Sequence, residues 1–239
     1  MTMKKSKDDL KKKSVEAALE WICKEFGSDK NLDIGIGSGT TIAFSFPLLS
    51  KFRNFRYVPT SRATEKGLEE QNLNIASYDS VERMKIDIDG TDEVDPEFNL
   101  LKGGGGCHNI EKKVAKKSKI FLVVCDDSKI VDHLGEKKKL PVEITKNSIN
   151  NALQELSRYG NANVRSENGN NFMTDSGNLI VDVDLNRNAV SGDLIKLEKE
   201  INKIEGVIEN GIFAERKADL VFIGRPEKVE ILKRSQFDE

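Results

Sequence analysis

The pattern of hydrophobic and polar positions changes along the chain near residue 140. Before that point, segments with apolar residues at helical spacing alternate with short, continuous apolar runs. Residues 9–26 show the helical spacing, whereas residues 119–125 (KIFLVVC) form a continuous run typical of a strand buried on both faces. Strands that alternate with helices predict an α/β fold with a Rossmann-like, mostly parallel sheet and helices on both faces.

The alternation extends over the whole first half. It predicts further strands at residues 32–35, 55–59, 74–78 and 84–89, and further helices at residues 41–52, 63–71 and 110–117.

The second half has a different organisation. Its segments predict a strand at 140–145, a helix at 148–160, short strands around Asn/Gly turns at 161–185, a helix at 193–203 and a strand-like run at 206–213. This order favours a smaller α+β (ferredoxin-like) module with antiparallel pairing. Residues 218–233 again predict a buried strand, here followed by a helix, and we expect that strand to rejoin the first sheet. The predicted domains are therefore 1–135 with 211–239, and an inserted 136–210.

Composition narrows the class of protein. The 239 residues include 33% charged and 37% hydrophobic side chains, with a formal net charge of −2. Overall basicity gives no indication of nucleic-acid binding, and no apolar stretch approaches the roughly 20 residues that span a bilayer. The three cysteines are far apart and lack zinc-ligand spacing. We therefore expect a cytoplasmic protein without nucleic-acid or membrane partners.

The first candidate binding element is the loop GIGSGTT, residues 35–41, between a predicted strand and a predicted helix. Free backbone N–H groups at the start of a helix favour an anion such as phosphate, and Ser38, Thr40 and Thr41 add hydroxyl groups. The loop lacks the Lys of a Walker motif, and Thr40 occupies the final Gly position of GxGxxG. A plain strand–helix turn is the alternative.

The second candidate element is acidic. Asp89 and Asp92 come at the carboxyl end of a strand, where open α/β sheets bind ligands. Such carboxylates can bind hydroxyl groups or relay protons, although a solvated acidic turn fits the same residues. The nearby Glu93, Asp95 and Glu97 are expected to be solvated charges.

The third candidate element is Lys102 followed by Gly103–Gly106. A cation beside unshielded amides can stabilise an oxyanion, and a flexible linker is the alternative. Glu111 is expected near the start of a helix capped by Asn109, where the helix dipole suits an ionised general base. From the position in the helix alone, a surface Glu that only satisfies the dipole is the favoured reading.

Lys129 follows Asp126, Asp127 and Ser128 at the end of the buried run 119–125 and could reach the same crevice, although a lone Lys is more often a solvated charge. The two histidines, His108 and His133, have no visible partner pattern and are expected to be structural.

These motifs resemble the type A ribose-5-phosphate isomerase family over nearly the whole chain. The resemblance rests on GIGSGTT (35–41), VPTSRATE (58–65), DGTDEVDPEFNLLKGGGG (89–106), IEKK (110–113), DDSKIVDHLG (126–135), LPVEI (140–144), TDSGNLIVDV (174–183) and GIFAERKADLVFIG (211–224). It implies interconversion of D-ribose 5-phosphate and D-ribulose 5-phosphate through an enediolate, with no metal or organic cofactor, in a homodimer or homotetramer.

The resemblance also implies residue roles. Glu111 would be the proton acceptor, with Asp89, Asp92 and Lys102 as further catalytic residues. The implied substrate-binding residues are Ser38, Gly39, Thr40, Thr41, Asp89, Gly90, Thr91, Asp92, Lys102, Gly103, Gly104, Gly105 and Lys129, with Lys11 as a candidate phosphate ligand. Residues 106–110 (GCHNI) depart from the commoner family pattern, which puts fine substrate contacts in question rather than the chemistry.

Two other functions compete. Residues 87–91 spell DIDGT, the nucleophile motif of haloacid-dehalogenase-type phosphatases, in which Asp87 would attack phosphate with Mg²⁺. That motif normally begins its domain, and the KGGGG loop has no part in its chemistry. The second alternative is a non-catalytic sugar-phosphate sensor, a class that usually carries a DNA-binding helix-turn-helix for which the segment ahead of residue 9 is too short.

Overall fold

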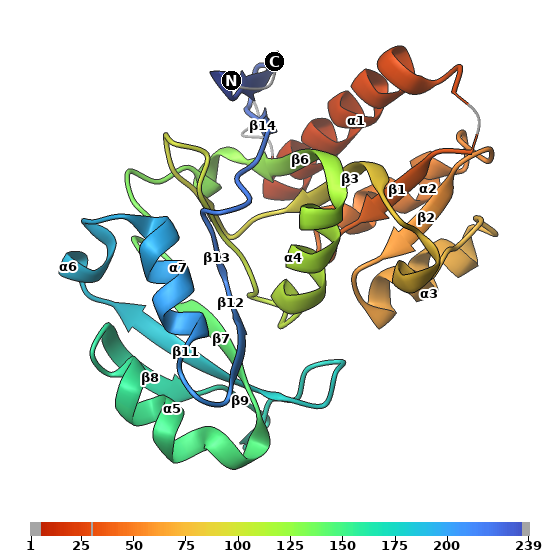
Figure 1. The fold of residues 1–239 in the computed structure, drawn as a ribbon. Helices are drawn as coiled ribbons and strands as arrows, with labels where there is room; N and C mark the ends of the chain where they lie inside the picture. Colours follow the sequence, from red (N-terminus) through yellow and green to blue (C-terminus); the bar gives the residue numbers. More distant parts are fainter. Residues whose placement is uncertain (1–5, 30, 236–239) are drawn as a thin grey trace. The chain divides into compact units, whose positions relative to one another are not determined.

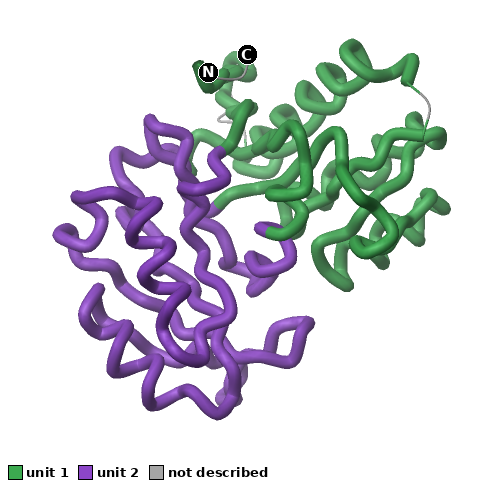
Figure 2. Tube along the Cα trace, viewed as in Figure 1, with its two compact units in different colours: residues 1–91, 113–129, 218–239 green, residues 92–112, 130–217 purple. Residues whose placement is uncertain are grey.

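The computed structural model describes residues 6–29 and 31–235, and the chain divides into two compact units (Figure 2). Unit 1 comprises Met1–Thr91, Lys113–Lys129 and Ala218–Glu239, and unit 2 comprises Asp92–Lys112 and Ile130–Lys217. Unit 2 thus includes segments that the sequence assigned to the first domain, namely 92–112, 130–135 and 211–217. The predicted division into folding domains stays a prediction.

Unit 1 is built on a six-stranded sheet in the order β15-β14-β6-β3-β1-β2 (Figure 1). The strands are β1 (Asp33–Ile36), β2 (Arg56–Pro59), β3 (Met84–Gly90), β6 (Ser118–Asp126), β14 (Leu220–Gly224) and β15 (Val229–Lys233). All neighbours pair in parallel except β14 and β15. The mostly parallel sheet is confirmed. Read from β2, the five parallel strands have the chain order 2-1-3-4-5 of doubly wound folds, whose ligands bind where the order reverses, here between β1 and β3.

The helical segments of unit 1 begin where the sequence supplies caps. Helix α1 (Lys7–Phe26) starts with a capping box between Ser6 and Asp9, and α3 (Arg62–Glu70) starts at Ser61, whose hydroxyl accepts from the N–H of Thr64. The remaining segments are η1 (Ile42–Ser45), α2 (Phe46–Leu49), η2 (Tyr78–Ser80) and η3 (Asp127–Lys129). Helix α4 (His108–Lys117) belongs to unit 2 up to Lys112 and to unit 1 from Lys113.

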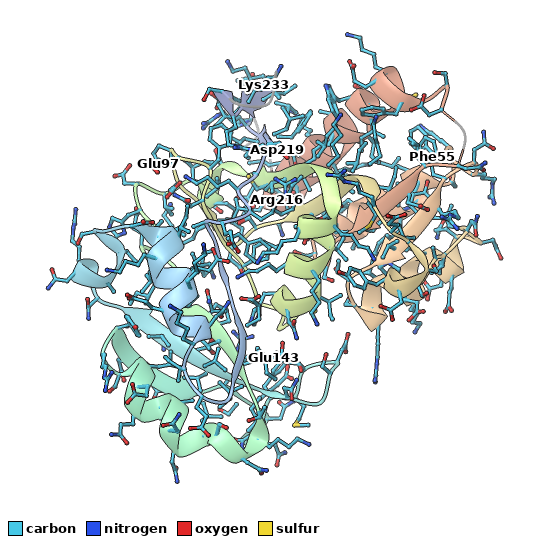
Figure 3. The ribbon with its side chains drawn as sticks, viewed as in Figure 1. Phe55, Glu97, Glu143, Arg216, Asp219 and Lys233 are labelled. Atoms are coloured by element: carbon cyan, nitrogen blue, oxygen red, sulfur yellow. The ribbon has the colours of Figure 1, made fainter. Side chains whose placement is uncertain are left out.

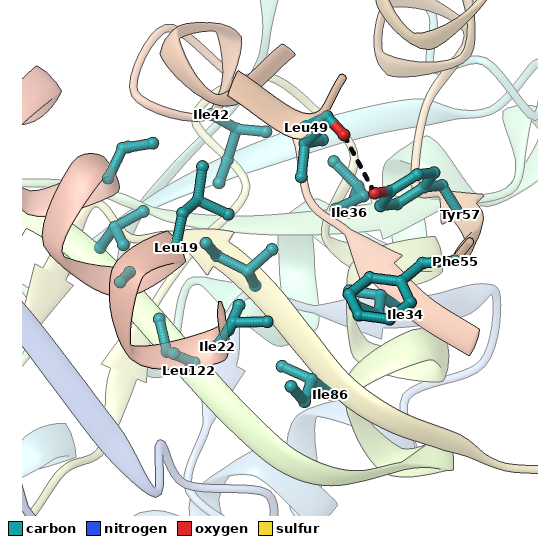
Figure 4. Close-up of a cluster of buried hydrophobic side chains, with 14 of the residues drawn as sticks. Leu19, Ile22, Ile34, Ile36, Ile42, Leu49, Phe55, Tyr57, Ile86 and Leu122 are labelled. Carbon is teal, nitrogen blue, oxygen red and sulfur yellow. Dashed lines mark hydrogen bonds between the residues drawn. The ribbon is translucent and has the colours of Figure 1, made fainter. Parts of the chain in front are cut away.

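Helices cover both faces of this sheet. On one face, Leu19 and Ile22 of α1 pack against alternate strand residues such as Ile34, Ile86 and Leu122 (Figure 4). On the opposite face Gly35 leaves room for α4, because a Cβ there would lie 2.4 Å from a methyl carbon of Val114. The absence of a side chain in the middle of β1 therefore sets how closely the second layer approaches the sheet.

Unit 2 contains a four-stranded antiparallel sheet in the order β12-β7-β11-β8. Its elements follow one another as β7 (Leu140–Ile144), α5 (Ile149–Leu156), β8 (Gly160–Val164), β11 (Leu179–Leu185), α7 (Leu194–Asn202) and β12 (Val207–Asn210). This is the β-α-β-β-α-β arrangement of ferredoxin-like domains, as predicted.

Smaller elements complete unit 2. They are the ribbon of β9 (Ser166–Glu167) and β10 (Asn170–Asn171), the three-stranded sheet of β13 (Ile212–Phe213), β5 (Leu100–Leu101) and β4 (Glu93–Val94), and the short α6 (Arg187–Val190) and η4 (Lys146–Ser148). None of the helices within residues 6–29 and 31–235 is long and apolar enough to cross a membrane.

Three local predictions are wrong. Residues 229–233 form strand β15 instead of a helix, because they pair with β14 and because Arg234 forms an ion pair with Asp219. The other carboxylate oxygen of Asp219, a residue labelled in Figure 3, accepts from the N–H of Phe121 at 2.8 Å. Residues 74–78 make only a single bridge, from Ile75 to Tyr57.

The third error concerns Glu93, which is fully buried instead of solvated. Its carboxylate accepts from the N–H groups of Gly135, Lys137 and Lys138 at 2.6 to 2.7 Å. Burial raises the pKa of Glu93 against the opposing effect of these three donors.

Candidate active site

The carboxylate of Asp89 binds the backbone of the glycine-rich turn of unit 1. One carboxylate oxygen, Oδ1, accepts from the N–H groups of Ser38 at 3.1 Å and of Gly90 at 2.7 Å. A Cβ at Gly37 would lie 1.8 Å from the same oxygen, so only glycine allows this approach. Asp89 is fully buried. It therefore joins the end of β3 to the end of β1, at the switch point of the sheet.

The exposed part of the turn offers a set of polar groups. Gly39 adopts φ +97°, and Gly39 and Thr40 face solvent. Behind them, the Ser38 hydroxyl lies 2.8 Å from that of Thr60, and the Thr64 hydroxyl donates to the carbonyl of Gly37. Lys11 of α1 donates to the Thr40 hydroxyl at 3.2 Å. A cation, hydroxyl groups and backbone amides thus gather at one place, a combination suited to an anion.

The helix after this turn is shorter than predicted. Residues 41–52 form η1 and α2, each of four residues, rather than one continuous helix. A macrodipole sums over aligned peptide groups, so these short segments contribute less to anion binding than the predicted helix. Lys11 supplies a full charge in its place.

Gly90 and Lys129 lie at the same carboxyl edge of the sheet. A Cβ at Gly90 would be 3.8 Å from the Ser38 carbonyl oxygen and 3.9 Å from Thr41. Thr91 follows Gly90 and is half-buried. Lys129 ends η3, directly after β6, the neighbour of β3. Unit 1 therefore brings its predicted site residues together at one edge, as parallel strands require.

In unit 2, Lys102 and Glu111 form a buried ion pair. The Lys102 ammonium lies 3.3 Å from Oε2 of Glu111, and their side chains are 3% and 6% exposed. The same ammonium is 5.7 Å from the ring centre of Phe213. Lys102 is held in place through its backbone, whose N–H donates to the carbonyl of Gly211 at 2.9 Å. An acid–base group and a cation thus lie in contact in a water-poor environment.

The glycine loop next to this pair is ordered by close contacts. Asp92 accepts from the N–H of Gly104 at 2.7 Å. Gly103 adopts φ +101°, and a Cβ there would lie 2.5 Å from Nδ1 of His108. Gly104 and Gly105 are exposed. The four glycines therefore form an ordered loop with exposed backbone groups, and they do not form a flexible linker.

Helix α4 starts one residue earlier than a cap at Asn109 requires. It begins at His108, and the N–H of Glu111 donates to the carbonyl of Cys107 at 3.0 Å. The prediction of Asn109 as the capping residue is wrong. Glu111 remains in the first turn, so the expected influence of the helix dipole on its carboxylate is kept.

A buried network fixes this first turn within unit 2. Lys112 donates to Glu198 at 2.9 Å, to Glu209 at 2.8 Å and to the carbonyl of Asn210 at 2.7 Å. Burial favours the neutral form of Glu209, but the charge and hydrogen bond of Lys112, together with hydrogen bonds from Asn202 and from the N–H of Asn210, lower the pKa of Glu209. Because Lys112 follows Glu111, anchoring Lys112 fixes the helix backbone at Glu111.

His108 is neutral in this setting. Its Nε2 lies 3.2 Å from the carbonyl oxygen of Glu209, which can only accept, so Nε2 carries the proton. Burial, followed by the charge of Lys112, lowers the pKa of His108 to about 3. The expectation of a structural histidine fits this environment.

Several known proteins are similar to this chain in sequence and in fold. The model of the family ribose 5-phosphate isomerase A (phosphoriboisomerase A) matches residues 56–228. A ribose-5-phosphate isomerase A from Prochlorococcus marinus subsp. pastoris is 39% identical over 203 residues, covering 81% of this chain and 87% of the relative. The chain belongs to the ribose 5-phosphate isomerase A family.

Solved structures of the isomerase family agree in fold. A crystal structure of ribose 5-phosphate isomerase A from Neisseria gonorrhoeae has a TM-score of 0.86 and 35% identity, covering 97% of this chain and 99% of that one. A D-ribose-5-phosphate isomerase in complex with phospho-erythronic acid has a TM-score of 0.89 and 34% identity, covering 96% and 100%.

Family membership disfavours the phosphatase alternative, and so does the place of Asp87. Its side chain is fully buried, and a Cβ at the neighbouring Gly35 would lie 2.7 Å from Oδ1 of Asp87. A nucleophile must meet its substrate, and this carboxylate lies inside the layer between β1 and α4.

Two residues that contact the neighbourhood of the candidate site were not identified from the sequence. Lys112 reads as one of several helix lysines, and its buried partners lie far along the chain. Arg165 stands in a polar stretch, yet it donates to the carbonyls of Gly103 and Gly104. Only the tertiary structure reveals either contact.

Proposed function

We propose that this chain interconverts D-ribose 5-phosphate and D-ribulose 5-phosphate. The observation that carries the proposal is the buried Lys102–Glu111 pair beside the open glycine loop. Family membership indicates the reaction. The pair offers a base for the proton transfer and a cation for the negative charge that develops.

Glu111 is proposed to remove the proton from C2 of the open-chain sugar and to return it to C1. The electrons of the C–H bond move into an enediolate, which places negative charge on oxygen. Lys102 and the exposed amide of Gly105 would stabilise this charge, because oriented donors in a water-poor site need no reorganisation when the charge develops, whereas the amide of Gly104 already donates to Asp92. Asp92 would hold a sugar hydroxyl and assist proton exchange between O1 and O2.

The turn of unit 1 is proposed to bind the phosphate. Its amides at Gly39–Thr41 and the hydroxyl groups of Ser38, Thr40 and Thr41 offer donors, and Lys11 and Lys129 offer charge. Gly90, Thr91 and Asp89 complete the proposed substrate-binding set. Asp89 has a structural role in this scheme as well, since it already accepts from two backbone N–H groups. Holding the non-reacting phosphate positions the sugar and reduces the entropic part of the barrier.

The deciding experiment is a coupled assay of ribulose 5-phosphate formation from ribose 5-phosphate in EDTA-treated buffer, with inorganic phosphate measured in parallel. We expect rapid isomerisation without phosphate release. Release of phosphate that requires Mg²⁺, or binding of the sugar phosphate without turnover, would replace the isomerase by one of its two competitors.

The proposal also includes the cellular compartment and the oligomeric state. Cys23, Cys107 and Cys125 are all free thiols, which suits a reducing, cytoplasmic compartment. The family resemblance favours a homodimer or homotetramer, and light scattering coupled to size-exclusion chromatography measures this directly.

A further inference from the structure

Arg165 connects three parts of unit 2 through one planar guanidinium group. It follows β8, and its Nε and Nη2 donate to the two carboxylate oxygens of Asp182, in β11, at 2.8 and 2.5 Å. The ring centre of Phe172 lies 5.4 Å from the guanidinium carbon. The side chain is only 15% exposed. A bidentate pair and a stacked ring fix the guanidinium in one orientation, which Lys could not reproduce.

The remaining nitrogen of the guanidinium binds the glycine loop. Nη1 donates to the carbonyl oxygens of Gly103 at 3.1 Å and of Gly104 at 2.9 Å. Both peptide groups are trans and planar, so each N–H points away from its own carbonyl. Holding the two carbonyls therefore sets the direction of the N–H groups of Gly104 and Gly105.

The observed hydrogen bonds agree with this constraint. The N–H of Gly104 donates to Asp92 at 2.7 Å, on the side away from Arg165. The N–H of Gly105 must likewise point away from Arg165, and Gly105 is exposed. Phe172 confines the end of the loop, since a Cβ at Gly106 would lie 2.6 Å from its ring.

The loop needs such restraint because of its composition. Glycine loses more backbone freedom on ordering than any other residue, and four occur in succession. An amide donor stabilises a developing oxyanion only if it already points at the oxygen. The positive charge of the guanidinium, which lies next to the two carbonyl oxygens, also polarises both peptide groups and strengthens their N–H donors.

We propose that Arg165, oriented by Asp182 and Phe172, is a positioning residue that holds the glycine loop so that the amide of Gly105 points at the enediolate and the amide of Gly104 holds Asp92. This inference rests on the proposed isomerase function and extends it to a residue that is not expected to touch the substrate.

The test compares Arg165→Lys with the wild type and with Arg56→Lys. Arg56 makes a similar bidentate pair with Asp33, at 2.6 and 2.7 Å, but on β2 of unit 1, so it controls for the loss of such a pair alone. We expect kcat of Arg165→Lys to fall by about 10- to 100-fold, the scale of a small misplacement of catalytic groups, with KM changed less than about threefold. Arg56→Lys should keep the wild-type kcat.

A binding measurement separates positioning from general damage. Phospho-erythronic acid carries a carboxylate, whose shared negative charge resembles that of an enediolate. Its dissociation constant, measured by calorimetry, should rise in Arg165→Lys by about the factor lost in kcat, because transition-state stabilisation and binding of such an analogue depend on the same donors. Melting temperatures are recorded for every variant.

The outcomes distinguish the two proposals. An inactive wild type overturns the isomerase function itself. An active wild type together with an Arg165→Lys variant that keeps more than half of kcat and of the affinity for phospho-erythronic acid overturns the role of Arg165. If Arg165→Lys does not fold, Asp182→Asn, which leaves Arg165 in place but removes half of its bidentate partner, decides by the same criterion.

Discussion

The ammonium of Lys102 lies 3.3 Å from the carboxylate of Glu111, and both side chains are almost completely buried. Two ions in such a place are tolerated only because each compensates the lost hydration of the other. The pair therefore links stability to chemistry, since the proposed base and the proposed oxyanion stabiliser hold each other in position before any substrate arrives.

Replacing Glu111 by Gln tests the base. The amide keeps the shape of the side chain but cannot accept a proton from carbon. We expect kcat to fall by at least about 10²-fold, the lower range for a positioned base, while KM for ribose 5-phosphate changes little. Steady-state kinetics with the coupled assay measure both. A variant with more than a tenth of the wild-type kcat would exclude Glu111 as the proton acceptor.

Replacing Lys102 tests how an unpaired carboxylate at Glu111 affects the stability of the fold. Lys102→Met leaves the Glu111 carboxylate buried without its cation, and we expect a loss of about 3–5 kcal/mol in the free energy of unfolding. The double variant Lys102→Met/Glu111→Leu should recover most of this loss, although it should be inactive, because no charge remains to be compensated. Urea denaturation at pH 7 measures the wild type, the single variants Lys102→Met and Glu111→Leu, and the double variant. Additive losses in the double variant would show that the two charges do not interact.

The sequence determines the elements whose patterns are local. Residues 120–125 are apolar without interruption, and only a strand covered on both faces buries all of them, as β6 does. Helix α1 carries its own cap and its own apolar stripe. The turn at 35–41 and the acidic loop at 89–92 likewise follow strand ends, which is why a sequence alone could place them on the same edge of a sheet.

The elements that long-range contacts decide were not predictable. Residues 229–233 have a composition that fits a helix or a strand, and pairing with β14 decides in favour of the strand. Arg165 lies about 60 residues after the loop that it holds, in a segment that reads as a polar turn. Lys112 looks like a solvated helix lysine until Glu198 and Glu209 come together around it.

The close approach of Asp89 to the turn predicts the effect of a single methyl group. In Gly37→Ala the new Cβ would lie 1.8 Å from Oδ1 of Asp89, so the carboxylate or the turn must move. We expect the melting temperature to fall by several degrees, in line with a loss of about 1–3 kcal/mol for overpacking, together with weaker binding of ribose 5-phosphate. Calorimetry measures both effects.

Gly192→Ala is the matched control for this substitution. No atom lies within 4 Å of a Cβ at Gly192, and its φ is not positive. We expect this variant to keep the wild-type melting temperature and affinity. Equal behaviour of the two alanine variants would mean that the contact between Gly37 and Asp89 does not constrain the turn.

The neutral state of His108 predicts how stability depends on pH. The folded protein holds the pKa of His108 at about 3, whereas an unfolded chain binds this proton below about pH 6.5. The contribution of His108 to stability is therefore complete above pH 6.5 and decreases as the pH falls towards 3, because only the unfolded state gains a proton in that window.

The comparison of His108→Gln with the wild type isolates this effect. Glutamine can donate to the carbonyl of Glu209 without titrating, so the variant should lose about 2 kcal/mol less than the wild type in its free energy of unfolding between pH 6.5 and pH 5. His133→Gln serves as the control, because the ring of His133 contacts the carbonyl of Leu134 and not that of Glu209. Urea denaturation across this range measures all three proteins. Equal slopes for His108→Gln and the wild type would show that His108 is not held neutral, and the loop at Gly103 would then face a charged ring.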